Sequence, residues 1–449
     1  MGMFMFRFVV KLHDSMDNVR VFVKSFGCSA NVSDGEFLAG CLAGAGFQLV
    51  DDLRLAHVVV YNTCGVKQPT EDRVIHELKK VPRDKKLIIV GCLPLINLER
   101  LRRETFFDAV AGPALGEGIV ELVQRVLDGE KVCALDSAAA TKPCLLLPKR
   151  RVNPVVGIVP ISYGCSGVCA YCCVRFARGR LRSYGIDEIV ERVKLDLREG
   201  VREVWLTAQD TGCYGRDIGV SLADLLNAVC RLPGRFYVRV GMMTPNFALE
   251  ILDELVEAFQ NEHVFKFLHL PVQSGDNQVL KLMNRKYTVE EFQLILKRFR
   301  EKIPHITVAT DIICGFPGET KEAFENSLRL IRQTKPDIVN VSKFFPRPGT
   351  AASRMRELFV PASEIKSRSR KIAALAKETG LLNNNRWIGW RGTVLIDEVG
   401  KADSWIGRNF AYKPVVFPNR GSSLLGMFVE AEIVDAAPTF LRGRMLNRT

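Results

Sequence analysis

The sequence predicts an α/β protein in three parts: a parallel α/β domain, a partial TIM-like barrel of six strand–helix units, and a small OB-like β-barrel. Short β-rich segments alternate with amphipathic helical segments as far as residue 385, and helical segments are absent after it. A stretch without periodicity divides the alternating region in two. The predicted boundaries are an N-terminal extension at 1–18, a first domain at 19–133, a linker at 134–154, a barrel at 155–385 and a β-module at 386–449.

Three β-rich segments define the first domain: VRVFVKSFGC, HVVVYNTCGV and KLIIVGCLPL. Helical patterns, SDGEFLAGCLAGAGF and TEDRVIHELKKV, lie between them. Because strands joined by helical crossovers run parallel, this segment is expected to form a small parallel sheet.

The central part repeats the same alternation over a longer stretch. Its predicted strands are VVGIVPIS, EVWLTA, YVRVGM, FKFLHLPV, TVATDII and IVNVSKF, with helices such as IDEIVERVKLDLRE between them. The helix TVEEFQLILKRFRE begins with a capping box formed by Thr288 and Glu291. A barrel would place its ligands at the carboxyl ends of these strands. An open, doubly wound sheet fits the same pattern and remains an alternative.

The C-terminal part contains only short β segments, WRGTVLIDEV, WIGRNFAYKPVVF and GMFVEAEIVDA, separated by Gly, Pro and Asn. This pattern favours a small closed barrel.

Charge and cysteine content restrict the class of protein. Sixty-three Lys and Arg against fifty Asp and Glu give a formal charge of +13, which slightly favours an acidic partner such as nucleic acid. Thirteen scattered cysteines indicate thiols kept free in a reducing cytoplasm. Arg7 and Lys11 interrupt the apolar N-terminus, so no secretory signal is expected, and no segment is long enough to span a membrane.

The segment YGCSGVCAYC places Cys165, Cys169 and Cys172 directly after the first predicted barrel strand. Three thiols in a glycine-rich loop favour a soft metal centre over three buried core cysteines. Three ligands leave one coordination position open, which favours an iron–sulfur cluster that binds a small molecule over a closed zinc site. Zinc with Cys173 as fourth ligand remains the alternative, although adjacent side chains rarely face the same ion.

Cys28, Cys64 and Cys92 each lie at the carboxyl end of one of the three strands predicted for the first domain. Those ends meet at one edge of a parallel sheet, so the three thiols are expected to converge on a second metal site. Cys41 lies among apolar residues of a helix and is expected in the core. The remaining thiols have no ligand spacing; they are Cys133, Cys144, Cys213, Cys230 and Cys314.

The spacing of Cys165, Cys169 and Cys172, with an aromatic residue at Tyr171, resembles the radical S-adenosylmethionine (SAM) enzymes. The resemblance implies a 4Fe–4S cluster whose open iron binds SAM, and a reductive cleavage that yields a 5′-deoxyadenosyl radical. It also implies the partial barrel.

Polar residues that follow three barrel strands are candidate SAM contacts. Gln209 and Asp210 follow the second strand, and Gln273 and Ser274 follow the fourth. Gly315 ends the fifth strand and could let the adenine approach the backbone closely. Each of these residues could instead serve only an ordinary loop or turn.

Basic residues gather in two places. One group follows the cysteine loop and could contact the cosubstrate carboxylate or RNA phosphates: Arg175, Arg178, Arg180 and Arg182. The other alternates with aromatic residues in the β-module, a pattern suited to single-stranded RNA: Trp405, Phe410 and Tyr412 with Lys401, Arg408 and Lys413. Aromatic residues of a small barrel more often form its core than a platform, so the core remains the alternative for each of them. His269, within a strand, is expected to be a hydrogen-bonded core residue.

Three spread cysteines before a radical SAM motif, followed by a small β-module, resemble the methylthiotransferases from residue 19 onward. The β-module is similar to the TRAM domain, which binds RNA. The segments RFARGRLRSY and RVGMMTP resemble the archaeal and eukaryotic group that modifies tRNA. The resemblance implies threonylcarbamoyladenosine, 3′ of the anticodon, as substrate, two SAM molecules per turnover, a sulfur source and an electron donor.

Carried over by position, the resemblance assigns an auxiliary 4Fe–4S cluster to Cys28, Cys64 and Cys92. It assigns the radical-generating cluster to Cys165, Cys169 and Cys172. Three residues depart from the family pattern without removing a ligand: Val168 for Asn, Cys173 for Ile and Gly35 for Ser.

Two alternatives remain open. The same chemistry could act on another modified adenosine or on a ribosomal protein side chain. A non-catalytic iron–sulfur electron carrier or RNA-binding protein is the more distant possibility.

Overall fold

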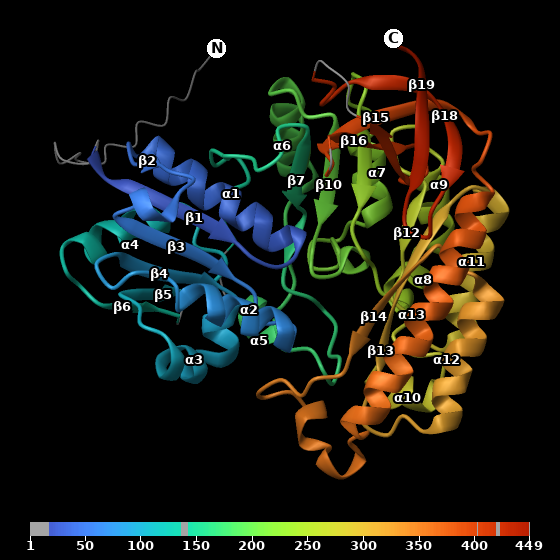
Figure 1. Ribbon diagram of the computed structural model, residues 1–449, viewed down its shortest axis with the longest axis horizontal. Coiled ribbons are helices and arrows are strands. Elements are labelled where there is room, and N and C mark those ends of the chain that lie inside the picture. Colours follow the sequence, from blue (N-terminus) through green and yellow to red (C-terminus); the bar gives the residue numbers. More distant parts are fainter. Residues whose placement is uncertain (1–17, 136–141, 402, 419–422, 449) are drawn as a thin grey trace. The chain divides into compact units, whose positions relative to one another are not determined.

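The computed structural model describes residues 18–135, 142–401, 403–418 and 423–448. The chain forms two compact units (Figure 1). The first comprises Met1–Cys64 and Pro69–Arg150, and the second comprises Gly65–Gln68 and Arg151–Thr449. The division at Arg150 falls inside the predicted linker, whereas the transfer of Gly65–Gln68 to the second unit was not predicted. Most of the predicted N-terminal extension, residues 1–17, lies outside the described residues.

The first unit is built on a parallel sheet of six strands in the order β2-β1-β3-β4-β5-β6. The strands are β1 (Arg20–Ser25), β2 (Gln48–Leu49), β3 (Val58–Thr63), β4 (Lys86–Gly91), β5 (Ala109–Ala111) and β6 (Val132–Ala134). The prediction found β1, β3 and β4. It missed the other three because strands of two or three residues carry no readable periodicity.

Helices cover both faces of this sheet (Figure 1). They are α1 (Ser29–Gly44), α2 (Gln68–Leu78), α3 (Leu93–Glu104) and α4 (Gly118–Leu127). Apolar side chains of α1 and α4 pack on one face, and those of α2 and α3 pack on the other. All six residues of β3 are buried, as expected for the centre of a sheet that is covered on both sides.

The second unit contains the six predicted barrel strands, in two three-stranded parallel sheets of order β11-β10-β7 and β12-β13-β14. The strands are β7 (Val156–Pro160), β10 (Glu203–Thr207), β11 (Tyr237–Val240), β12 (Phe267–His269), β13 (Thr307–Cys314) and β14 (Ile338–Lys343). A parallel bridge between Val238 and Val264 links the two sheets just before β12. Spatial order follows chain order, which confirms the partial barrel over the doubly wound alternative.

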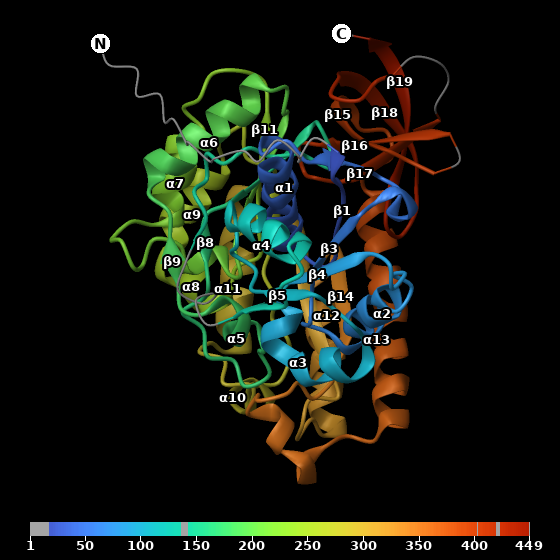
Figure 2. The same ribbon diagram turned by 90° about the vertical axis from the view of Figure 1, so that its left-hand side faces the viewer.

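Helices follow the barrel strands, as predicted. They are α5 (Val174–Arg178), α6 (Ile186–Arg198), α7 (Leu222–Val229), α8 (Pro245–Glu250), α9 (Leu252–Phe259), α10 (Asn277–Leu282), α11 (Val289–Lys302), α12 (Lys321–Thr334) and α13 (Ala362–Asn385). The capping box of α11 is present, with Glu291 N–H donating to Thr288 Oγ1 and Thr288 N–H to Glu291 Oε2. Helix α13 runs beside α12 and β14 (Figure 2). In the described part of the chain, no helix is both long and apolar enough to cross a membrane.

The C-terminal module is a closed five-stranded barrel of order β15-β16-β17-β19-β18. Its strands are β15 (Arg391–Val399), β16 (Ser404–Asn409), β17 (Pro414–Pro418), β18 (Phe428–Ala436) and β19 (Leu441–Arg448). The predicted segment WIGRNFAYKPVVF is two strands, because Tyr412 adopts a positive φ of 60° between β16 and β17.

The structure contradicts the predicted RNA platform on this barrel. Trp405 is in the barrel core, and Tyr412 packs against Phe267 of the central barrel with ring centroids 4.9 Å apart. Buried Lys413 donates to Asp337 Oδ1 at 2.6 Å, and Arg408 donates to Asp397 Oδ2 at 3.1 Å. The alternation reflects the junction between the two barrels.

A buried carboxyl pair lies at this junction. Glu203 of β10 accepts from Trp205 Nε1 and lies beside Asp397 and Arg408 of the C-terminal barrel. Burial, together with the Asp397 carboxylate, raises the pKa of Glu203 to about 8. Burial also raises the pKa of Asp397. The folded pair therefore retains a proton at neutral pH that the unfolded chain releases near pH 4.5.

Because the folded state binds this extra proton, stability is expected to fall as pH rises from about 4.5 to about 8, by up to ~1.4 kcal/mol per pH unit. Glu203→Gln is expected to flatten this fall and to raise stability at pH 9. Urea unfolding from pH 5 to pH 9 measures both effects. A variant that kept the wild-type slope would show that the proton is held elsewhere.

Candidate active site

The loop that carries the three predicted barrel cysteines begins at Gly164. This glycine has a φ of +74°, and a Cβ there would lie 1.9 Å from the carbonyl oxygen of Arg180. Its N–H donates to Gln209 Oε1 at 2.6 Å, which ties the loop to the end of β10. Only glycine fits this conformation and this close approach, so Gly164 sets the direction in which the chain enters the cysteine loop.

Gly164→Ala is expected to destabilise the second unit by at least about 2 kcal/mol more than Gly200→Ala, and to reduce iron binding. Gly200 is the matched control because it also has a positive φ, +97°, but nothing lies within 4 Å of the position of its Cβ. Urea unfolding and iron content measure the two effects. Equal losses in the two variants would contradict the role of the close approach to Arg180.

The sulfur atoms of Cys165 and Cys169 both lie close to Gly167. A Cβ on Gly167 would lie 3.2 Å from Cys165 Sγ and 3.8 Å from Cys169 Sγ. The Gly167 N–H donates to Cys165 Sγ at 3.1 Å, and the Cys172 N–H donates to the carbonyl oxygen of Cys169 at 3.1 Å. All three cysteines are half-buried. The loop thus gathers three partly accessible thiols and supplies a backbone donor to one of them.

The chemistry of this thiol set fits a cluster better than a single ion. Across the described ranges, no three His, Cys, Asp or Glu side chains are arranged to hold one metal ion. Cys thiolates are the ligands that would hold a four-iron cluster. Burial raises the pKa of Cys172 to about 12, whereas a hydrogen bond with Cys213 lowers the pKa of Cys165. Metal binding would overcome the cost of deprotonating Cys172.

Two further side chains contact this set and were not predicted. Cys213 shares a side-chain hydrogen bond with Cys165, and its Sγ is 3.2 Å from the carbonyl oxygen of Asp210. Arg285 Nη1 donates to Cys169 Sγ at 2.9 Å. Neither residue has ligand spacing, and both come from segments far from the cysteine loop in sequence. Only the folded barrel brings them to it.

Cys173 is not part of the three-cysteine set, although it follows Cys172 directly in the sequence. It is buried, and its Sγ donates toward the carbonyl oxygens of Gly65 and Val66 at 3.7 and 3.9 Å. A thiol engaged in this way is not directed at the three-cysteine set, which disfavours zinc with Cys173 as fourth ligand.

Gln209 and Asp210, the candidates that follow the second barrel strand, lie at the same carboxyl edge of the barrel as the cysteine loop. Gln209 reaches the cysteine loop through Gly164. Asp210 is buried, and its carboxylate accepts from the N–H and Oγ1 of Thr244 at 3.1 and 2.7 Å and from the Gly212 N–H at 3.0 Å. Burial raises the pKa of Asp210. Asp210 therefore organises the loops around it, and a direct SAM contact for either residue remains a prediction.

Gln273 and Ser274 are buried after β12. Gln273 has a φ of 71°, uncommon for a residue with a side chain, and its N–H donates to the carbonyl oxygen of Asp311 at 2.8 Å. Gly315 has a φ of 73°, and Ile365 of α13 fills the space in front of it, 2.2 Å from the position of a Cβ. The structure thus supplies a packing reason for glycine at 315, and its proposed contact with adenine is untested.

The structure also gives the contacts of Tyr171 and His269. Tyr171 packs edge-on against Phe316, with centroids 6.1 Å apart. His269 is hydrogen-bonded, as predicted, with Nε2 3.0 Å from Asp311 Oδ1.

The arginines after the cysteine loop have different environments. Arg178 is buried, with its guanidinium 5.3 Å from the ring centroid of Tyr163. Arg182 donates to the carbonyl oxygens of Arg178 and Arg180. Arg175 and Arg180 are exposed and remain candidates for phosphate or carboxylate contacts.

In the first unit, Cys28, Cys64 and Cys92 follow β1, β3 and β4 at one edge of the sheet. A Cβ on Gly27 would lie 2.9 Å from Cys64 Sγ, so Cys28 and Cys64 lie on adjacent chain segments. Cys92 Sγ is 3.6 Å from Asn31 Oδ1, and Asn31 Nδ2 donates to the carbonyl oxygen of Thr63 at 2.9 Å. The buried amide of Asn31 thus spans the loops that carry these cysteines.

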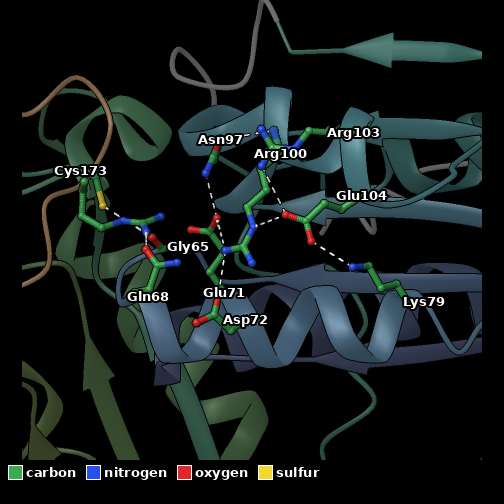
Figure 3. Close-up of polar contacts among 11 residues, drawn as sticks. Gly65, Gln68, Glu71, Asp72, Lys79, Asn97, Arg100, Arg103, Glu104 and Cys173 are labelled. Atoms are coloured by element: carbon green, nitrogen blue, oxygen red, sulfur yellow. Dashed lines mark hydrogen bonds and ion pairs between the residues drawn. The ribbon is translucent and has the colours of Figure 1, made fainter.

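An ion-pair network joins the helices that follow two of these cysteines (Figure 3). Arg100 of α3 donates to Glu71 of α2 at 3.0 Å and to Glu104 at 2.9 Å. Glu71 is fully buried and also accepts from Asn97 Nδ2 at 2.8 Å. Because buried charge is costly unless paired, this network fixes α2 against α3 and hence the loops that precede them.

Three segments of the chain match known protein families. Residues 159–331 match the radical SAM superfamily, residues 20–112 match the uncharacterized protein family UPF0004, and residues 388–446 match the TRAM domain. A probable threonylcarbamoyladenosine tRNA methylthiotransferase of Pyrococcus abyssi is 42% identical over 96% of this chain and 100% of its own length. This chain belongs to that methylthiotransferase family.

The family extends to eukaryotes. The threonylcarbamoyladenosine tRNA methylthiotransferase of Homo sapiens is 36% identical over 95% of this chain and 74% of its own length. Among solved structures, the radical SAM methyltransferase TsrM from Kitasatospora setae, with tryptophan substrate and a SAM analogue bound, has a TM-score of 0.55 over 74% of each chain. At 15% identity, this match supports the fold alone.

The three departures from the methylthiotransferase pattern have different surroundings. Val168 is exposed, and its carbonyl oxygen accepts from Asn284. Cys173 donates toward Gly65. A side chain at Gly35 would meet Ser25 Oγ, 1.8 Å from the position of its Cβ. None of the three displaces a predicted ligand.

Proposed function

We propose that this chain is a radical SAM enzyme that adds a methylthio group to C2 of threonylcarbamoyladenosine, 3′ of the anticodon in tRNA. The observation that carries the proposal is full-length similarity to methylthiotransferases of that name, in a chain with a cysteine triad at the carboxyl edge of each α/β unit. All thirteen cysteines are free, which fits a reducing compartment such as the cytoplasm.

Cys165, Cys169 and Cys172 are proposed to hold a 4Fe–4S cluster with one open iron. These residues would hold a cluster that, when bound, would supply a binding position for SAM and the electron for its cleavage to methionine and a 5′-deoxyadenosyl radical. The chain's own part is to position this chemistry: Gly167 supplies a donor to Cys165, and Tyr171 packs the loop against Phe316. The electron comes from an external reductant.

Cys28, Cys64 and Cys92 are proposed to hold the auxiliary 4Fe–4S cluster. One SAM supplies the methyl group to sulfur, and a second supplies the radical that removes hydrogen from C2. That hydrogen would leave in 5′-deoxyadenosine, and the methylthio group would take its place on the base. Forming this carbon–sulfur bond would release one electron, which the auxiliary iron–sulfur centre would accept. A sulfur source must replace the sulfur transferred in each turnover.

Gln209 and Gln273 are the proposed polar contacts to SAM, with Asp210, Ser274 and Gly315 shaping the loops beside them. Gln209 uses its oxygen to hold Gly164, which leaves its amide nitrogen to donate to the cosubstrate. Gln273 is held in a positive-φ conformation, a form of backbone strain that concentrates at functional sites.

The C-terminal barrel is proposed to bind the tRNA through arginines rather than through the predicted aromatic residues. Arg391 and Arg444 flank Glu432 across neighbouring strands, and their side chains are both 67% exposed. Arg442 of β19 is 61% exposed. These arginines were not predicted as RNA contacts, although the alternation of Arg442 and Arg444 along LRGRMLNR is a sequence signal that could have indicated this face.

The test is mass spectrometry of nucleosides from tRNA that contains threonylcarbamoyladenosine. Reconstituted protein, reductant, sulfide and SAM are incubated without oxygen, beside the Cys165→Ala variant. A methylthio product that is absent with the variant supports the proposal. Formation of 5′-deoxyadenosine without a modified nucleoside would retain the radical chemistry and reject this substrate in favour of another adenosine or a protein side chain. Intact SAM with an iron-loaded protein would favour a carrier.

A further inference from the structure

Arg285 is a charged side chain placed against the proposed cluster ligands. It follows α10, in the segment MNRKYT, and its Nη1 donates to Cys169 Sγ at 2.9 Å. The side chain is half-buried, so it does not extend freely into solvent. Within the described residues, no Asp or Glu forms an ion pair with Arg285. Its shortest side-chain hydrogen bonds go to Cys169 Sγ and Tyr287 Oη, each at 2.9 Å, and the buried Asp210 carboxylate interacts with its charge without an ion pair.

The guanidinium is held in this position by several contacts. Nε donates to Tyr287 Oη at 2.9 Å, and Nη2 donates to the carbonyl oxygen of Pro271 at 3.4 Å. Buried Tyr287 in turn donates to the carbonyl oxygen of Val272 at 2.8 Å. Because the planar guanidinium is fixed along its length by the chain that follows β12, its charge is preorganised toward Cys169.

A cation beside the proposed cluster would favour the reduced form of that cluster. Thiolate ligands make the whole centre anionic, and one-electron reduction adds a further negative charge. A guanidinium is charged at every accessible pH, and hydrogen bonds to cluster sulfur favour the more negative state. Partial burial weakens solvent screening of this interaction.

We propose that Arg285 is a positioning residue that raises the reduction potential of the cluster held by Cys165, Cys169 and Cys172. This inference rests on the proposed function, because it requires a redox-active cluster at those cysteines. Arg285 acts through Cys169, and its role concerns the electron that the cluster accepts before SAM is cleaved.

The test is an anaerobic redox titration of the reconstituted full-length protein, followed by electron paramagnetic resonance. The signal that changes on addition of SAM identifies the cluster concerned. Arg285→Met is expected to lower the equilibrium constant for its reduction at least tenfold, about 59 mV for a one-electron couple. Lys286→Met is the matched control: it removes the adjacent, exposed cation and is expected to leave the potential unchanged.

Arg285→Lys and Arg285→Gln separate charge from structure. The lysine variant is expected to have the higher potential of the two, because it alone retains a cation near Cys169. If Arg285→Met does not retain iron, the lysine and glutamine variants provide the test. Equal reduction potentials in these two variants would overturn the inference. A wild-type potential in Arg285→Met with a raised KM for SAM would overturn it as well, and would assign Arg285 to the cosubstrate.

Different results would reject the proposed function and the role of Arg285. A wild-type protein that holds iron but shows no SAM-responsive signal would reject the proposed function itself. A wild-type protein with that signal, and an unchanged potential in iron-loaded Arg285→Met, would reject only the role of Arg285.

Discussion

Replacing Cys165 with alanine is expected to abolish SAM cleavage, with 5′-deoxyadenosine falling more than about 100-fold, since even changes around metal ligands cost 10–100-fold. Cys165 is placed by Gly164, accepts from the Gly167 N–H and contacts Cys213, so its position is determined by the whole loop. A cluster left with two thiolates loses both iron affinity and its defined open site. Quantitative mass spectrometry of 5′-deoxyadenosine, with iron and sulfide analysis, measures the effect.

Cys230→Ala is the matched control for this variant. Cys230 is a buried thiol of the same unit, at the end of α7, and burial raises its pKa to about 11. It takes no part in the proposed cluster, so iron content and SAM cleavage are expected to match those of the wild type. If Cys165→Ala retained both iron and wild-type cleavage, the cluster would have to be sought at other cysteines.

Replacing Cys64 with alanine is expected to separate the two halves of the reaction. The methylthio nucleoside should fall more than about 100-fold, whereas 5′-deoxyadenosine should still form. The physical reason is that Cys64 belongs to the cysteine set of the first unit, whereas the barrel cysteines lie in the second. Nucleoside and 5′-deoxyadenosine analysis of the same reaction measures both outcomes.

Cys41→Ala provides the comparison within the first unit. Cys41 is buried in α1 among apolar residues, as predicted, and burial raises its pKa to about 11. Its loss is expected to leave both products at wild-type levels in the folded protein. Methylthio product from Cys64→Ala at the wild-type level would reject the auxiliary site. Loss of both products would show that the two sets are not independent.

Much of the candidate site could be predicted from the sequence because its residues are local or are repeated at strand ends. Cys165, Cys169 and Cys172 lie within eight residues, so one loop suffices to gather them. Cys28 and Cys64 needed only the rule that parallel strands end at one edge. Cys213 and Arg285 could not be found in this way, because their relation to the loop depends on how distant segments pack.

The predicted RNA-binding face of the C-terminal barrel shows what the sequence pattern could not decide. Aromatic and basic residues alternate in the C-terminal barrel, and a sequence pattern cannot distinguish a face that stacks on bases from one that packs on a neighbouring domain. The structure packs half-buried Tyr412 against Phe267 and pairs Lys413 with Asp337. Arg391, Arg442 and Arg444 remain exposed. Arg391 lies on the predicted strand β15, whereas Arg442 and Arg444 lie on β19, where no strand was predicted.

The amino-acid sequence by itself determined the α/β class, the six strand–helix units, the C-terminal β-module and the two cysteine sets, because periodicity and spacing can be read along the chain. The order in which the strands pair decided between a partial barrel and an open, doubly wound sheet. Tertiary structure decided which polar residues are engaged in the fold, as with Asp210, Lys413 and the carboxyl pair of Glu203 and Asp397. It also decided that Arg285 faces a thiol. Burial and pairing depend on contacts between distant segments, and only the packed barrel determines them.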